Sequence, residues 1–136
     1  MSIGWGQFDT EPPEIVDFQF TSETTLDITN ESQQLYYSFS VIDDLSGTDY
    51  CYGHFKSPNG YDDVQIGGVS FDTDELEDTV ENFITIPQFI EPGVYTLEII
   101  ICYDDSENYG YFYYSDFEEL GFSNEFEVIN NSEFDT

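Results

Sequence analysis

The stretch that decides the fold class is Leu35-Tyr36-Tyr37-Ser38-Phe39-Ser40-Val41. Its large apolar side chains fall on every second residue, at Leu35, Tyr37, Phe39 and Val41. Successive side chains of a β-strand point to opposite faces, so this spacing is typical of a strand with one buried face. We therefore expect a long strand here and an all-β protein around it.

Shorter runs of the same kind lie on both sides of this strand. They are rich in Phe, Tyr, Val and Ile, which suit a pleated, half-buried surface. They cover residues 15–21, 26–28, 50–55, 64–71, 80–86, 94–103, 109–114 and 126–128, with Pro, Gly, Asn and Ser between many of them. This pattern predicts an antiparallel β-sandwich of seven to nine strands. Its core would hold Val16, Phe18, Phe20, Tyr37, Phe39, Val41, Leu97, Ile99 and Ile101.

The charge of the chain is extreme. Of its 136 residues, 30 are Asp or Glu, Lys56 is the one basic residue apart from His54, and the formal net charge is −29. Nucleic-acid binding needs cations for phosphate contacts, so we exclude that class of partner. We also expect no membrane insertion, because no apolar stretch is long enough to cross a bilayer. Divalent cations and cationic proteins or surfaces are the partners that this charge favours.

The length fits one domain with flanking segments. We expect an N-terminal arm at residues 1–8, a sandwich at 9–129 and a polar tail at 130–136. Trp5 and Phe8 have no core of their own in the arm, so we expect it either to pack on a neighbouring copy or to be a disordered leader. The chain begins without the basic and apolar regions of a Sec-type signal peptide, and this leaves its location open.

Several short motifs, taken in order, resemble bacterial immunoglobulin-like domains. They are Asp9-Thr10-Glu11-Pro12-Pro13-Glu14-Ile15, Asp43-Asp44-Leu45-Ser46-Gly47, Phe55-Lys56-Ser57-Pro58-Asn59-Gly60, Glu91-Pro92-Gly93-Val94-Tyr95 and Asp104-Asp105-Ser106-Glu107-Asn108. The last one stands where the family often has Asp-x-x-Gly-Asn. The resemblance covers residues 9–129 and implies an immunoglobulin-like sandwich, used in tandem in large secreted or surface proteins. This chain is more acidic than members of that family.

The resemblance also places Cys51 and Cys102 on neighbouring strands of one sheet. A disulfide needs both side chains on the same face. Alternation with Leu97, Ile99 and Ile101 points Cys102 outward, while the face of Cys51 is open. A disulfide and two free thiols therefore both remain as alternatives.

The sequence gives little support for an enzyme. A catalytic triad of the serine or cysteine type needs a histidine base, and His54 is the one histidine. It lies in a predicted strand, so we interpret it as an ordinary strand residue. A glycosidase needs two carboxylates across a cleft, which a small sandwich rarely offers.

The acidic loops are the best functional clue in the sequence. In the implied sandwich, three distant segments meet at one end and bring together Asp9, Glu11, Asp43, Asp44, Asp104, Asp105 and Asn108. Carboxylate and amide oxygens are the ligands that Ca²⁺ prefers. We therefore predict a Ca²⁺ site there, with ordinary solvated turn residues as the alternative.

These observations lead to a leading function and two alternatives. The leading function is a non-enzymatic structural or adhesive module, located outside the cell or on its surface, that contacts neighbouring copies or tandem domains and is stabilised by Ca²⁺. The first alternative is an acidic inhibitor that imitates nucleic acid and captures a basic protein. The second is an accessory carbohydrate-binding module that uses exposed aromatic residues at Tyr109–Tyr114.

Overall fold

The computed structural model describes residues 11–43, 47–71 and 74–131. The predicted arm, the ligand candidates Asp9 and Asp44, and residues 132–136 lie outside this part of the chain. The described strands are β1 (Glu14–Phe20), β2 (Thr25–Asp27), β3 (Gln33–Ile42), β4 (Thr48–Lys56), β5 (Asp63–Ser70), β6 (Glu77–Ile86), β7 (Gly93–Asp104), β8 (Tyr109–Tyr113) and β9 (Glu125–Ile129), and the helix is α1 (Tyr114–Leu120). The predicted runs thus became strands, and a short helix, for which the strand pattern gave no signal, lies between the last two of them.

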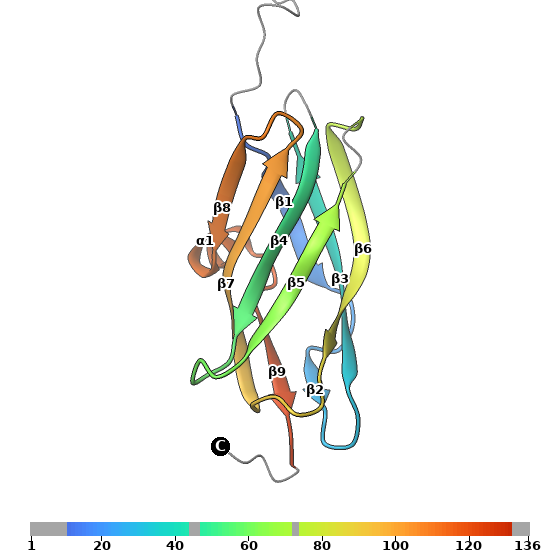
Figure 1. Cartoon of the computed structure of the whole chain (residues 1–136), viewed down its shortest axis with the longest axis vertical. Coiled ribbons are helices and arrows are strands. Elements are labelled where there is room, and N and C mark those ends of the chain that lie inside the picture. Colours follow the sequence, from blue (N-terminus) through green and yellow to red (C-terminus); the bar gives the residue numbers. More distant parts are fainter. Residues whose placement is uncertain (1–10, 44–46, 72–73, 132–136) are drawn as a thin grey trace, which may run out of the picture.

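The strands form a sandwich of two sheets, shown in Figure 1. The smaller sheet has the order β1-β3-β6. The larger has the order β2-β9-β7-β4-β5, and β8 pairs with the same side of β7 as β9 does. The pairing is antiparallel except for β2 with β9, which run parallel. The all-β sandwich predicted from the alternation is therefore present.

The core lies between the two sheets and is rich in aromatic rings. Phe18 packs edge-on against Phe39, with ring centroids 5.1 Å apart, and both side chains are fully buried. On the other sheet, Phe126 contacts Phe55 and Tyr95 at 5.2 Å. Large rings fill the space between sheets that are about 10 Å apart. Of the predicted core, Phe18, Tyr37, Phe39, Val41 and Leu97 are buried, and Phe20 packs partly buried against the core.

A β-bulge in β1 corrects the prediction for Val16. Ile15 pairs with Val41 while Asp17 pairs with Ser40, so Val16 is an extra residue in its strand. A bulge shifts the side-chain alternation by one position. Ile15 and Phe18 therefore both face the core, and Val16 is 39% exposed.

A second bulge corrects the prediction for β7. Opposite β4, Ile99 pairs with His54 and Leu97 with Phe55, which makes Glu98 the extra residue. Leu97 and Ile100 both face inward as a result, whereas Ile99 and Ile101 are half-buried on the outer face. The same shift turns Cys102 inward, so the expected outward orientation of Cys102 was wrong.

Cys51 and Cys102 form a disulfide inside the core. The two residues are directly opposite each other on β4 and β7, with their Cα atoms 4.1 Å apart, and both are fully buried. This settles the alternative that the sequence left open. The bond staples two neighbouring strands of the larger sheet.

Hydrogen bonds lock the end of the sandwich that carries the β4–β5 and β6–β7 turns. Asp62 donates its backbone NH to Ser57 Oγ at 3.0 Å and accepts the Glu91 NH at 2.8 Å. The buried Tyr95 hydroxyl donates to the Glu91 carbonyl at 2.7 Å. A Cβ on Gly93, whose φ is +126°, would collide with the Pro58 ring. Two of the motifs noticed in the sequence are therefore parts of one structural corner.

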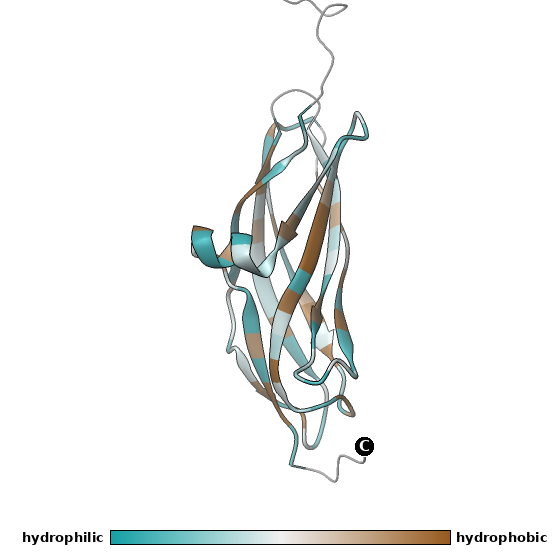
Figure 2. Cartoon of the chain, turned by 90° about the vertical axis from the view of Figure 1, so that its left-hand side faces the viewer, coloured by the Kyte–Doolittle hydropathy of each residue, from teal (hydrophilic) through white to brown (hydrophobic). Residues whose placement is uncertain are grey.

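Helix α1 stands out from the side of the sandwich between β8 and β9 (Figure 2). Asp116 accepts the Tyr113 NH at 2.9 Å at its start, and Gly121 ends it with φ of +77°. Phe117 anchors it to the core, 5.5 Å from Phe18. The helix connects β8, which pairs with residues 99–103 of β7, to β9, which pairs with residues 93–96 on the same edge of β7.

Candidate binding surfaces

Two surfaces of the sandwich gather side chains that could bind a partner: one is rich in carboxylates and the other in tyrosines. The first is the acidic end, which we define by residues 11–14, the end of β3 with Asp43, and the β7–β8 turn at residues 104–108. Glu11 and Asp43 line one shallow hollow there, and Asp105 donates its NH to the Gly47 carbonyl at 3.0 Å. The structure thus brings the described parts of the three segments to one end of the sandwich (Figure 1).

Asp104 holds the β7–β8 turn together. Its Oδ1 accepts the NH groups of Ser106 and Asn108 at 2.9 and 2.8 Å, and its Oδ2 accepts the Asn108 side-chain NH at 2.9 Å. Asp104 is 2% exposed, and a buried carboxylate needs such partners. Asp and Asn side chains commonly form turns in this way. These contacts give Asp104 and Asn108 a structural role.

Asp43 has a comparable place in the β3–β4 turn. It is buried, and its Oδ2 accepts the Gly47 NH at 3.1 Å. Within residues 11–43, 47–71 and 74–131, no three acidic, His or Cys side chains gather closely enough to hold a metal ion. These ranges include five of the seven predicted ligands: Glu11, Asp43, Asp104, Asp105 and Asn108. The predicted site also needs Asp9 and Asp44, which lie outside them, so it stays a prediction.

The second surface is the outer face of the larger sheet. Six tyrosines gather there on three neighbouring strands, and we call them the tyrosine face: Tyr50, Tyr52, Tyr103, Tyr109, Tyr111 and Tyr113. The strand register aligns them in rows, with Tyr50 opposite Tyr103 and Tyr103 opposite Tyr109. In the next row, Ile101 lies between Tyr52 and Tyr111. The face is thus a continuous aromatic and aliphatic surface.

The rings of this face contact one another. Tyr50 and Tyr103 are stacked with centroids 4.8 Å apart and planes at 12°, and Tyr52 lies 6.2 Å from Tyr103 at 11°. Tyr109 meets Tyr111 edge-on at 5.4 Å. Contacts of this kind between aromatic rings are stabilising beyond the area that they bury.

The phenol groups of the face also interact. A side-chain hydrogen bond with Tyr52 raises the pKa of Tyr103 to about 12, and partial desolvation adds to the effect. A hydrogen bond with Tyr109 raises the pKa of Tyr111 in the same direction. Both hydroxyls therefore stay protonated near neutral pH, and the rings carry no charge of their own.

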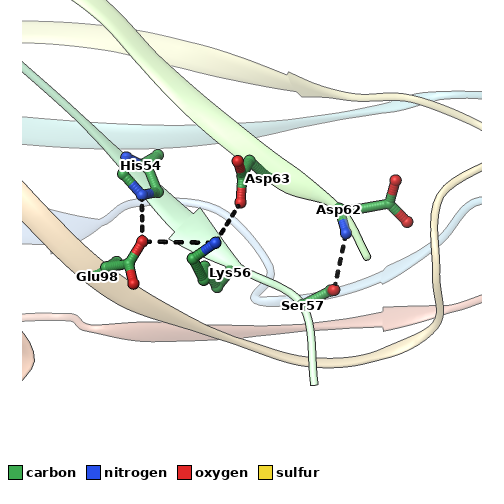
Figure 3. Close-up of polar contacts among 6 residues, drawn as sticks. All are labelled: His54, Lys56, Ser57, Asp62, Asp63 and Glu98. Atoms are coloured by element: carbon green, nitrogen blue, oxygen red, sulfur yellow. Dashed lines mark hydrogen bonds and ion pairs between the residues drawn. The ribbon is translucent and has the colours of Figure 1, made fainter. Parts of the chain in front are cut away.

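The lower part of the face carries a small ion cluster, drawn in Figure 3. Glu98 Oε1 lies 2.5 Å from His54 Nε2 and 3.6 Å from Lys56 Nζ, and Lys56 Nζ lies 3.3 Å from Asp63 Oδ1. The contacts with Asp63 and Glu98 raise the pKa of Lys56. Within the described residues, the hydrogen-bond partner of His54 is thus a carboxylate and not a serine or cysteine. The neighbouring pair Ser57 and Asp62, also shown, belongs to the structural corner.

Sequence reasoning found only part of this face. It noticed Tyr109–Tyr114 as exposed aromatics but missed Tyr50, Tyr52 and Tyr103. The signal was available, because tyrosine recurs at every second residue in 50–52 and in 109–113. The sequence alone does not show that β4, β7 and β8 pair side by side, and this pairing is what brings the tyrosines together.

Comparisons with known proteins add little. No family model and no curated protein matches the chain. Among solved structures, the chain resembles part of a β-glucosidase from Listeria innocua, solved in complex with glucose, at 16% identity and a TM-score of 0.40. The match covers 88% of this chain and 16% of that enzyme, so the chain spans a small fraction of its length. So distant a likeness supports no functional argument.

A membrane-spanning helix would have to be long and apolar. In the part of the chain that the structure describes, no helix meets those requirements.

Proposed function

We propose that this chain is a non-enzymatic structural or adhesive module with an immunoglobulin-like sandwich, working outside the cell and using the tyrosine face as its contact surface. The observation that carries the proposal is that face. Monomeric proteins rarely leave a large continuous patch of exposed rings, and tyrosine is enriched where proteins bind partners. A rigid sheet also presents the rings at low entropic cost.

Strand order supports the immunoglobulin-like part of the proposal. If β1, β3 and β6 correspond to strands A, B and E, and β9, β7, β4 and β5 to G, F, C and C′, the strand order is the one expected of an immunoglobulin sandwich, with β8 and α1 left unassigned. The bond from the Tyr95 hydroxyl to the Glu91 carbonyl also matches the tyrosine corner near the start of strand F. The disulfide is a departure, because it joins neighbouring strands of one sheet rather than the two sheets.

The disulfide supports the proposed location. Disulfides persist in secreted and surface proteins and are rare in reducing compartments. The same setting offers millimolar Ca²⁺, which would fill even a weak site at the acidic end. Binding of Ca²⁺ and contact with tandem neighbours are parts of this proposal.

A carbohydrate-binding role is the second candidate, and the same rings favour it. Tyr109, Tyr111 and Tyr113 lie about half exposed along one strand, where sugar rings have access to them. This candidate shares the contact surface and differs in the partner.

Retention on defined surfaces tests the proposal. The parent would be passed over amine-coated, carboxyl-coated and polysaccharide-coated beads beside Tyr52→Thr/Tyr111→Thr, in which threonine keeps the strand propensity. The matched control is Tyr36→Thr, since Tyr36 is 45% exposed on the other sheet and Tyr111 is 49% exposed. We expect the parent and the control to be retained on at least one kind of bead, and the double variant to pass through that same kind of bead. Equal behaviour of all three proteins on every surface would contradict the proposed role of the face.

A further inference from the structure

The charges around the tyrosine face are nearly all negative. Asp49 directly precedes Tyr50, and the exposed Asp105 and Glu107 lie in the turn that joins Tyr103 to Tyr109. Helix α1 follows Tyr113 directly and carries Asp116, Glu118 and Glu119. Carboxylates therefore stand in the turn at the upper end of this neutral aromatic surface, and others lie on the helix that directly follows Tyr113.

The cations of the chain do not offset these carboxylates. Lys56 and His54 are its one lysine and one histidine, and it has no arginine. Both lie at the lower end of the face, where Glu98 contacts each of them and Asp63 contacts Lys56. The upper end, with Tyr50, Tyr103 and Tyr109, therefore keeps its negative border.

We propose that the tyrosine face binds an arginine-rich, cationic protein segment. This inference rests on the proposed function of the face and adds the class of partner. A guanidinium stacks on aromatic faces through cation–π attraction, and its planar fork of donors also reaches carboxylates. Rings bordered by acids offer both contacts at once. The net charge of −29 would also speed the approach of a cationic partner.

The charge argues against the other occupants. A second copy would bring another net charge of −29 to the face, so repulsion opposes face-to-face pairing at low salt. A neutral glycan would use the rings and gain nothing from the acidic border. The arginine-rich segment is the occupant that uses both features.

Titration with short fluorescent peptides tests this inference. The probes are an all-arginine peptide and an all-lysine peptide of equal length. The proteins are the parent, Tyr52→Leu/Tyr111→Leu on the tyrosine face, and Tyr36→Leu/Phe83→Leu on the outer face of the smaller sheet as the matched control. Leucine keeps apolar area and removes the aromatic ring, and all four replaced side chains are partly exposed.

We expect the parent to bind the arginine peptide more tightly than the lysine peptide, because guanidinium stacks better on rings. Each exposed ring is worth about two- to fivefold in affinity, so the variant, which lacks two rings, should bind the arginine peptide about 4- to 25-fold more weakly. The control variant should match the parent. Circular dichroism of each variant shows that folding is retained.

Other outcomes would overturn the inference. Equal binding by all three proteins, with no preference for arginine, would show nonspecific attraction of polycations. No binding by the parent would overturn it as well. In either case, the bead experiment still tests the proposed function. If Tyr52→Thr/Tyr111→Thr is no longer retained on polysaccharide-coated beads, the tyrosine face is a contact surface and its partner is a glycan. If that variant is retained as well as the parent on all three kinds of bead, the proposed function is contradicted too.

Discussion

The outer faces of the two sheets differ in how their aromatic residues are placed. On the smaller sheet, Tyr36 and Phe83 form one pair, 5.6 Å apart, among polar neighbours such as Ser40 and Thr79, whose hydroxyls are 2.8 Å apart. On the larger sheet, six tyrosines occupy adjacent register positions on three strands. A lone exposed pair is normal on a protein surface, whereas a continuous set of rings is typical of a contact surface. Register, more than composition, makes the difference.

The largest expected effect concerns the inner and outer sides of the smaller sheet. Phe39→Ala removes a fully buried ring and should cost about 3–5 kcal/mol of the free energy of unfolding. The partner variant Phe83→Ala removes a ring that is 44% exposed and should cost less than about 1 kcal/mol. Urea unfolding measures both. Similar losses in the two variants would show that the faces of β3 and β6 are assigned wrongly.

The larger sheet differs from the smaller by its covalent staple. Because the cysteines are 51 residues apart, Cys51→Ala/Cys102→Ala should lower the free energy of unfolding by about 2–4 kcal/mol. Urea unfolding of the variant, beside the parent with and without reductant, measures this. The reduced parent should behave like the variant. A variant as stable as the oxidised parent would show that the disulfide does not stabilise the fold.

The Ca²⁺ hypothesis concerns the acidic end, where strands of both sheets finish. A specific ion should stabilise the fold by about 2.7 kcal/mol at a hundredfold excess over its Kd, and more than Mg²⁺ or NaCl at matched ionic strength. Thermal unfolding in EDTA and in each salt measures it. Glu11→Gln and Asp105→Asn should reduce the response, while Glu127→Gln, on β9, should not. If NaCl at matched ionic strength stabilises the fold as much as Ca²⁺ does, the effect is screening of surface charge and not binding at a specific site.

A smaller effect is expected in the β7–β8 turn that carries part of the tyrosine face. Glu107 has φ of +69°, a conformation that favours glycine, and it stands where the resembled family often has glycine. Glu107→Gly should therefore stabilise the fold by about 0.5–1 kcal/mol. Glu107→Gln separates the backbone effect from the loss of charge. If the glutamine variant gains as much in thermal unfolding, charge repulsion is the cause.

Alternation in the sequence predicted most of the strands but could not locate the bulges. A bulge adds one residue to a strand without changing its composition, and it reverses the faces of every residue beyond it. Val16 and Glu98 are the added residues, and they explain why Val16, Ile99, Ile101 and Cys102 were assigned to the wrong faces. The disulfide was left open because the face of Cys51 could not be assigned, since Tyr50 and Tyr52 compete with Phe55 for the core.

The candidate sites followed a similar pattern. The segments with Glu11, Asp43 and Asp104 were expected to meet at one end, because the resemblance to immunoglobulin-like domains implied a sandwich that brings them there. It could not show that Asp104 is held by hydrogen bonds within its own turn. Only the Tyr109–Tyr114 part of the tyrosine face was noticed in the sequence, because the full face depends on the pairing of β7 with β4, which is distant in sequence.

The central claim is that contact occurs on the tyrosine face and not on the outer face of the smaller sheet. Hydroxyl-radical footprinting with and without the all-arginine peptide, read residue by residue by mass spectrometry, tests it within one sample. Tyr52 and Tyr111 should become protected, while Tyr36 and Phe83, which are similarly exposed, should be labelled as before. Protection of Tyr36 and Phe83 equal to that of Tyr52 and Tyr111 would contradict the account.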